Sequence, residues 1–271
     1  MRIQQYVPCR ALAPHVHSFY EIQHDLPVDV SMNVSFGCTG RSHFVFCLQS
    51  PFQCLDNDGA PMDICESTLF TQISRPYTKN FCGPTLGLTI DFTPSGLYAL
   101  WPMPAQAMSE RSYDLTAVIT RDTRDLTDQL RNTPSTAQRF AVLEMFLLRQ
   151  LARAKRTDGR IEAAVRAIQQ RPGHVDFGQL AWQLNCSERT LRRRFTEQVG
   201  HSPKYHARIQ RFLHTWRWLK RDTSPHWHDL IQAGGYYDQA HLINEFRHFS
   251  GGSPLRYETG ATGLHDSLRE S

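Results

Sequence analysis

The sequence lacks several features that mark whole classes of protein. None of its hydrophobic runs is long enough to span a bilayer. No uninterrupted apolar stretch follows Arg2 near the N-terminus, so no secretory signal is predicted. The chain also has no glycine-rich phosphate loop, no internal repeat and no low-complexity tract. These absences lead us to expect a globular, cytoplasmic protein that does not enter a membrane.

The cysteines do not form a recognisable framework. There are seven of them, an odd number at irregular spacing, in a chain of 271 residues that is long enough to build two hydrophobic cores. Disulfide bonds are therefore not expected. No Ser/His/Asp set and no pair of carboxylates stands out, so we expect no catalytic residues, no enzyme activity, no metal and no cofactor.

Charge is distributed unevenly along the chain. The net charge of the whole sequence is +4, but residues 160–260 hold 15 Lys and Arg against 9 Asp and Glu, which is a net charge of +6. Residues 1–159 are close to neutral. A basic C-terminal region indicates either a polyanionic partner or merely a solvated surface, and charge alone does not separate the two.

The first part of the chain, residues 1–113, is predicted to be rich in β-strands. Residues 44–48 form a short apolar run, and residues 86–92 alternate between apolar and polar side chains. Turn residues separate these pieces, among them the run 56–59, Asp-Asn-Asp-Gly. We expect a compact β-rich domain here.

Residues 114–156 are predicted to be helical. Ser135 with Gln138 three residues later is a capping-box pattern that begins a helix. Its apolar stripe indicates either packing on the β-rich domain or a contact between two chains, and both remain open. The stripe consists of Phe140, Leu143, Leu147 and Leu151. A polar segment, residues 153–159, follows as a linker.

Residues 175–200 have the pattern of two short helices across a tight turn. Asp176 and Ser187 are predicted to cap them, and Leu191 and Phe195 are predicted to pack inward. The outer face of the second helix is basic and suits the major groove, where guanidinium groups bind guanine or phosphate. A solvated basic face is the alternative. The arginines concerned are Arg189, Arg192, Arg193 and Arg194.

A second such pattern occupies residues 224–257. Ser224 and Pro225 are predicted to begin its first helix, Gly234-Gly235 to form the turn, and Asp238 to cap the next helix. Gln239, His241 and Asn244 lie on or near the outer side, with Arg247 close by. Between the two patterns, a helix from Pro203 to about Lys220 would span roughly 27 Å, close to the ~34 Å of one DNA turn.

Three stretches resemble the AraC/XylS family of transcription regulators. They are CSERTLRRRF followed by VGHSP, then GGYYDQAHLINEFRHFSGGSP, and the long helix between them. The resemblance covers about 100 residues and implies an all-α DNA-binding domain over 160–260 with a tail over 261–271. Two residues depart from the family pattern: Asn244 stands where a basic residue is common, and Ile231 where a small one is usual.

The resemblance also implies function. A bacterial activator that binds double-stranded DNA is expected, with base contacts from Arg189, Arg192 and Arg193 in the first unit and from Gln239, His241 and Asn244 in the second. Residues 73–101 resemble the sensor-like domain of one branch of these regulators. The resemblance therefore implies a small-molecule effector or a homodimer, and RNA polymerase as a partner.

Two alternatives start from the N-terminal residues. One is a regulator that senses metal or thiol oxidation through His15, His17 and His24 or through Cys47 and Cys54. The other is a DNA-repair enzyme of the Ada type, which needs four zinc-binding cysteines with close-set pairs. The chain has no Cys-x-x-Cys or Cys-x-x-x-Cys pair, which argues against the repair enzyme.

Overall fold

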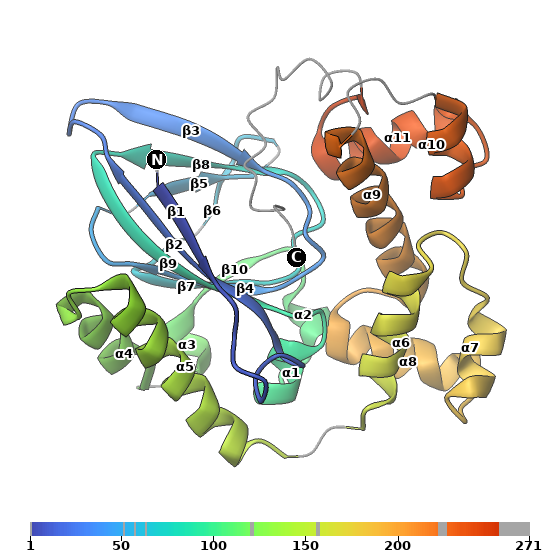
Figure 1. The fold of residues 1–271 in the computed structure, drawn as a ribbon, viewed down its shortest axis with the longest axis horizontal. Coiled ribbons are helices and arrows are strands. Elements are labelled where there is room, and N and C mark those ends of the chain that lie inside the picture. The colour runs from blue at the N-terminus through green and yellow to red at the C-terminus, as the bar shows by residue number, and fades with distance from the viewer. Residues whose placement is uncertain are drawn as a thin grey trace.

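In the computed structural model, the chain has two regions that differ in secondary structure (Figure 1). The structure describes residues 2–50, 52–56, 58–62, 64–119, 122–155, 158–221 and 227–254. All of the strands described lie in the N-terminal region, and the described part of the C-terminal region forms helices only. The α+β fold class expected from the sequence is therefore confirmed.

Ten strands form two antiparallel sheets in the described part of the N-terminal region. One sheet has six strands in the order β1-β2-β9-β4-β7-β10, and the other has four in the order β3-β8-β5-β6. Their bounds are β1 (Arg2–Tyr6), β2 (Val16–Asp25), β3 (Ser31–Phe36), β4 (His43–Cys47), β5 (Gln53–Leu55), β6 (Pro61–Met62), β7 (Ser67–Phe70), β8 (Tyr77–Cys82), β9 (Pro84–Phe92) and β10 (Ser112–Asp114).

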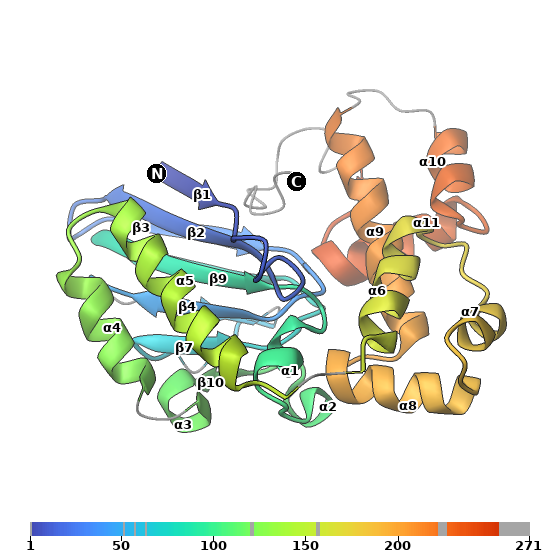
Figure 2. The ribbon, with the colours of Figure 1, turned by 60° about the horizontal axis from the view of Figure 1, so that its bottom comes forward.

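The six-stranded sheet has an apolar core on each face because its strands alternate. On β4, Phe44 and Phe46 belong to the core on the helix side, whereas Val45 and Cys47 belong to the core against the four-stranded sheet. The region therefore has three layers, with the larger sheet in the middle. The helices that cover its outer face are α1 (Gly96–Leu100), α3 (Leu115–Ile119), α4 (Asp122–Asn132) and α5 (Thr136–Arg153) (Figure 2).

Helix α5 begins as the sequence predicted and packs on the sheet. The Ser135 side chain accepts a hydrogen bond from the backbone N–H of Gln138, and Arg139 forms a buried ion pair with Glu21 of β2 at 2.9 Å. This ion pair fixes which face of α5 lies against the sheet.

The expected dimer contact on α5 needs a correction. Phe140, Leu143 and Leu147 are at most 4% exposed and lie inside the core that α5 shares with the sheet. Leu151 is partly buried against the same core. A side chain inside a domain core cannot contact a second chain, so packing on the β-rich region is the correct alternative for this stripe.

Six helices form the described part of the C-terminal region, around two apolar cores. They are α6 (Arg160–Gln170), α7 (Phe177–Gln183), α8 (Glu188–Val199), α9 (Pro203–Arg221), α10 (Trp227–Gly234) and α11 (Gln239–Ser250). One core joins α6, α7 and α8, and the other joins α9, α10 and α11. The expected cap at Ser224 and Pro225 and the tail 261–271 lie outside the described residues.

The loop between β3 and β4 reaches into the second of these cores. Cys38 is completely buried with Ile209, Phe212 and Phe249, and its backbone N–H donates to the carbonyl of Phe249. Gly40 lies so close that a Cβ there would come within 2.8 Å of Ile209. The N-terminal region thus supplies part of the core of the second helical pair.

Among the described residues, no helix combines the length and apolar character that crossing a bilayer requires.

Candidate nucleic-acid interface

The first helical pair is α7 with α8. The Asp176 side chain accepts from the backbone N–H of Gln179, and Ser187 accepts from that of Thr190, so both predicted caps are present. Asn185 has a φ of 51° in the turn between the helices, which suits an asparagine. α8 ends at Gly200, which has a left-handed conformation.

Helix α8 separates an apolar face from a basic one. Leu191, Phe195 and Val199 are buried, and Arg189, Arg192 and Arg193 are exposed. The one ion pair of these three arginines within the described residues joins Arg193 to Glu197 at 3.9 Å, on the surface. Such an exposed pair contributes little stability, so the guanidinium groups remain available to an anion.

Arg194 differs from its neighbours. Its guanidinium forms an ion pair and a hydrogen bond with the carboxylate of Asp158, in the segment that leads to α6. Arg194 therefore holds the linker against α8. The sequence grouped all four arginines, because spacing on a helix does not reveal a partner so far along the chain.

A groove of about 630 Å³ runs along the basic face of α8. Arg189, Arg192 and Arg193 line it, together with Gln106 of the short helix α2 (Ala105–Met108). The start of α9 contributes Ser202 and Tyr205. The N-terminal region thus contributes a side chain to the groove along the candidate DNA-binding face.

The second helical pair is α10 with α11. Gly235 has a φ of 66° in the turn, and the Asp238 side chain accepts from the backbone N–H of His241. Leu242, Phe246 and Phe249 are buried. Glu245 is buried as well and forms ion pairs with Arg208 at 2.7 Å and Arg211 at 2.9 Å, which fasten α11 to α9.

His241 lies at the surface of this pair, with 38% of its side chain exposed. Its Nδ1 accepts a hydrogen bond of 3.2 Å from the backbone N–H of Tyr237, so the ring proton is on Nε2. Nε2 lies 3.7 Å from the Glu245 carboxylate and 3.5 Å from Arg211 Nη2. The contact with Arg211 brings two donors together and is not a hydrogen bond. One ring nitrogen, Nδ1, is therefore used within the domain itself.

Gln239, Asn244 and Arg247 are exposed on α11. Beside them stands Tyr237, which is 91% exposed and directly precedes the cap of α11. Tyr237 is not among the outer residues that the sequence pattern predicts for this unit, and its exposure is seen only in the structure.

The N-terminal region contacts the ends of both pairs. The Tyr98 hydroxyl donates to Glu197 at 3.1 Å, and the Ser109 hydroxyl donates to the carbonyl of Gly200 at 3.1 Å. The Tyr205 hydroxyl donates to Ser74 at 2.8 Å and lies 3.0 Å from His248 of α11. Movement of the N-terminal region would therefore reach both helical pairs.

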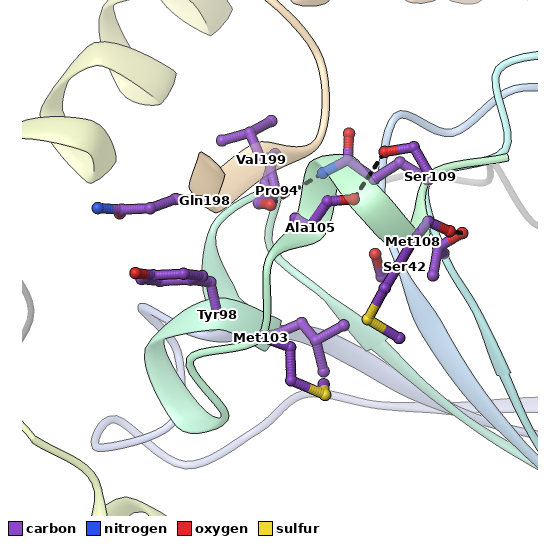
Figure 3. A pocket seen from close by; sticks show the side chains of 12 residues that line it. Ser42, Pro94, Tyr98, Met103, Ala105, Met108, Ser109, Gln198 and Val199 are labelled. Atoms are coloured by element: carbon purple, nitrogen blue, oxygen red, sulfur yellow. Dashed lines mark hydrogen bonds between the residues drawn. The ribbon is translucent and has the colours of Figure 1, made fainter. Parts of the chain in front are cut away.

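A small pocket lies at this junction, between α1, α2 and the end of α8 (Figure 3). Its volume is about 20 Å³, which suits roughly one water molecule. Gln72 lines it, and its buried Oε1 has no hydrogen-bond partner in the structure. The pocket is thus suited to a bridging water and is too small for an organic ligand.

The residues of the sensing alternative do not form a joint site. His15 lies in the turn before β2 and His17 lies within β2, so the two histidines are not on one strand. Burial raises the pKa of Cys47 and of Cys54 to about 11, which disfavours the reactive thiolate. Within the described ranges, no three His, Cys, Asp or Glu side chains lie close enough to hold a metal ion.

Two family models match the chain. Residues 180–260 match a helix-turn-helix domain, and residues 4–114 match a domain of unknown function, DUF6597. No curated protein matches the chain. The two helical pairs with their exposed second helices thus define a DNA-binding domain of the helix-turn-helix class. The C-terminal region is a domain of the AraC type, as the resemblance implied.

Several solved structures are similar over most of the chain at low identity. ToxT from Vibrio cholerae O395 is 10% identical, with 91% of this chain and 99% of that chain covered and a TM-score of 0.48. Unsaturated fatty acid bound ToxT from Vibrio cholerae strain SCE256 is 10% identical, with coverages of 90% and 97% and a TM-score of 0.46. The AraC-like transcriptional activator CuxR is 14% identical, with coverages of 81% and 91% and a TM-score of 0.32.

Proposed function

We propose that the chain is a sequence-specific transcription regulator that inserts α8 and α11 into successive major-groove segments of one DNA duplex. The observation that carries this proposal is the outer face of α8. Arg189, Arg192 and Arg193 stand exposed there, with no buried carboxylate partner among the described residues. Three exposed guanidinium groups on one helix face repel one another, and phosphates or guanine edges relieve that repulsion.

The second reading surface is weakly charged. Tyr237, Gln239 and Asn244 offer a ring and two side-chain amides at the start and middle of α11. A side-chain amide can form two hydrogen bonds with the edge of one adenine, and an apolar group can contact the methyl group of thymine. We assign the base contacts of the second unit to these three residues; the resemblance had implied His241 as one of the contacting residues.

The spacing of the two surfaces supports one continuous site. Helix α9 has 19 residues, which corresponds to a rise of about 28 Å. Successive major-groove segments on one face of DNA are ~34 Å apart. The buried ion pairs of Glu245 with Arg208 and Arg211 keep α11 at a fixed position along α9.

The N-terminal region is assigned a regulatory role in this proposal. It binds a small-molecule effector, and its contacts with the ends of α8 and α11 pass the effect to DNA binding. The AraC-type domain further implies contact with RNA polymerase and pairing of two chains. With the inner stripe of α5 buried, any pairing through α5 would use its outer face, where Met145 is 51% exposed.

DNA binding by the full-length chain tests the proposal. A duplex selected by the protein from a random library is labelled, and affinity is measured by fluorescence anisotropy over a range of salt. The log of affinity should fall with the log of salt by ~0.9 for each phosphate neutralised. Affinity that does not change with salt would contradict the proposal.

Two neighbouring arginines provide a matched pair of variants. Arg192→Ala should cost about 1–3 kcal/mol at the selected duplex, because a bidentate contact is lost. Arg194→Ala also removes one positive charge from α8, but this charge already pairs with Asp158. The variant should therefore lose much less DNA-binding free energy. Equal losses in both variants would show that only total charge matters and would overturn the role of the outer face.

A further inference from the structure

The short helix α2 belongs to the N-terminal region but packs on the end of α8. The hydroxyl of Ser109, directly after α2, lies 3.1 Å from the carbonyl oxygen of Gly200 and 2.8 Å from that of Ala105 (Figure 3). A Cβ on Gly200 would collide with Ser109 and come within 3.3 Å of the Ala105 carbonyl. The glycine that ends α8 therefore also lets α2 approach closely.

Two further contacts join the N-terminal region to the same end of α8. The Tyr98 hydroxyl of α1 donates to the Glu197 carboxylate at 3.1 Å. Nε2 of His201, just after α8, donates to the backbone carbonyl of Gln72 at 3.2 Å. These contacts come from separate segments of the N-terminal region, so a shift of α2 along α8 would break several of them at once. The position of α2 relative to α8 is thus fixed by the fold.

Gln106 of α2 is exposed and lines the groove along the basic face of α8. Arg189, Arg192 and Arg193 line the same groove. Within the part of the chain that the structure describes, the Gln106 side chain makes no hydrogen bond. Its amide nitrogen can donate two hydrogen bonds. The groove therefore holds an uncharged donor from the N-terminal region beside three cations from α8.

The place of Gln106 in the groove favours the DNA backbone over a base as its partner. In helix-turn-helix proteins the N-terminal residues of the inserted helix contact base edges. Gln106 stands on a different helix and at the opposite end of α8, because Ala105 beside it packs near Gly200. A side chain in that position meets the sugar-phosphate strand that borders the major groove. Glutamine amides are among the donors that bind phosphate oxygens there.

We propose that Gln106 donates a hydrogen bond to a phosphate of the bound DNA, so that α2 forms one border of the DNA-binding surface. The N-terminal region then takes part in DNA binding directly, through a side chain of its own. The contacts with Glu197, Gly200 and His201 set the distance between this donor and the arginines of α8. The inference rests on the proposed insertion of α8 into the major groove.

Charge substitutions at Gln106 in the full-length protein test the contact. Gln106→Lys places a cation beside the phosphate and should raise the affinity for the selected duplex at low salt. The slope of log affinity against log salt should steepen by ~0.9, since one more phosphate is neutralised. The gain over the wild type should therefore shrink about 3.5-fold for each fourfold rise in salt. Gln106→Glu should weaken binding, because like charges then face each other. Fluorescence anisotropy measures both.

Gln53 of β5 provides the matched control. It is also an exposed glutamine of the N-terminal region, but it lies in the four-stranded sheet and does not line the groove. Gln53→Lys and Gln53→Glu change the net charge in the same way and should leave both affinity and salt slope as in the wild type. A gain of affinity in Gln106→Lys cannot come from misfolding. If the Gln106 variants behave like their Gln53 counterparts, the contact is overturned.

Gln106→Ala distinguishes a phosphate from a base as the partner. Loss of a phosphate contact should weaken binding to the selected duplex and to a duplex of random sequence by the same factor. A loss confined to the selected duplex would assign Gln106 to a base edge and overturn the assignment to the backbone.

The arginine variants keep this inference apart from the proposed function. If Arg192→Ala loses affinity as expected while the Gln106 variants match the Gln53 variants, only the contact of α2 fails. If the wild type does not bind DNA, or binds it independently of salt, the proposed function fails, whatever the Gln106 variants do.

Discussion

The two helix-turn-helix units share their construction and differ in their surfaces and cores. Ser187 caps α8 and Asp238 caps α11 in the same manner, and both helices end at a glycine in a left-handed conformation. Yet α8 presents three arginines, whereas the start of α11 presents Tyr237 and Gln239. The first unit has an apolar core, and the second encloses the charged side chain of Glu245.

Under the proposed function, this difference predicts that the two units play different parts in DNA binding. Guanidinium groups give affinity that depends on salt and is partly independent of base sequence. A ring and two amides give little attraction to phosphate and discriminate between base edges. We expect the first unit to supply most of the affinity and the second to supply selectivity, which the following changes test.

The largest effect is expected from removing the basic face of α8. The triple variant Arg189→Ala, Arg192→Ala, Arg193→Ala should weaken binding more than about 1000-fold, from three contacts of about 1–3 kcal/mol each. The matched triple in the second unit, Tyr237→Ala, Gln239→Ala, Asn244→Ala, should weaken it by about 10- to 100-fold. Anisotropy at one fixed salt concentration compares the two, and equal losses would remove the proposed division.

A smaller effect, on folding, is expected at the buried charge of the second unit. Glu245→Ala leaves Arg208 and Arg211 without their carboxylate and should cost about 3 kcal/mol in the free energy of unfolding. Urea unfolding measures it. Glu197→Ala in the first unit is the control: its carboxylate is 45% exposed, and its loss should cost under about 1 kcal/mol.

Acid should destabilise the first unit through His206. This ring is fully buried and packs on Phe195, and burial lowers its pKa from 6.5 to about 3. Below pH 6.5 the unfolded chain takes up a proton that the folded chain does not, so stability present above 6.5 is lost as the pH falls towards 3. The loss is about 1.4 kcal/mol per pH unit.

The variant His206→Phe isolates this contribution. Other buried histidines, such as His17, whose pKa is also lowered to about 3, remain in both chains. The difference in unfolding free energy between wild type and variant should therefore change as the pH falls from 6.5. A difference that stays constant from neutral pH to pH 4.5 would refute the assignment to His206.

The smallest effect is expected from single changes on α11. Tyr237→Ala should cost about 1 kcal/mol and remove a preference for thymine at one position of the selected site. His241→Ala should lower stability by a similar amount and leave base preference unchanged, because Nδ1 of His241 accepts a hydrogen bond from the backbone of Tyr237 within the domain. Selecting duplexes from the random library with each variant measures its base preference directly. A changed preference in His241→Ala together with an unchanged one in Tyr237→Ala would return His241 to the DNA-reading surface.

The sequence was informative where structure depends on neighbours along the chain. The caps at Ser135, Asp176, Ser187 and Asp238 follow from a side chain that accepts from the backbone N–H three residues ahead. The alternation of residues 86–92 likewise predicted a strand, since its period is a property of the strand alone.

What the sequence did not reveal depends on partners far along the chain. Arg194 flanks the other three arginines of α8 in the sequence, and only the arrival of Asp158 from the linker shows that its guanidinium group already has a partner. The apolar stripe of α5 could pack equally well on a sheet or on a second chain. The ion pair that fixes α5 on the sheet joins Arg139 to Glu21, which lie 118 positions apart in the sequence. The buried position of Lys79 on β8 likewise depends on the rings of Phe36, Phe52 and Phe70, which come from three other segments.

The insertion of Cys38 has a consequence for how the chain is made. Synthesis runs from the N-terminus, so the loop that carries Cys38 leaves the ribosome long before Ile209 and Phe249, the residues it covers. The last helices to emerge thus complete their core on a surface that is already in place. A regulator made by joining this C-terminal region to a foreign sensor would lack that surface. A functional exchange of sensors between such proteins would therefore have to retain the β3–β4 loop.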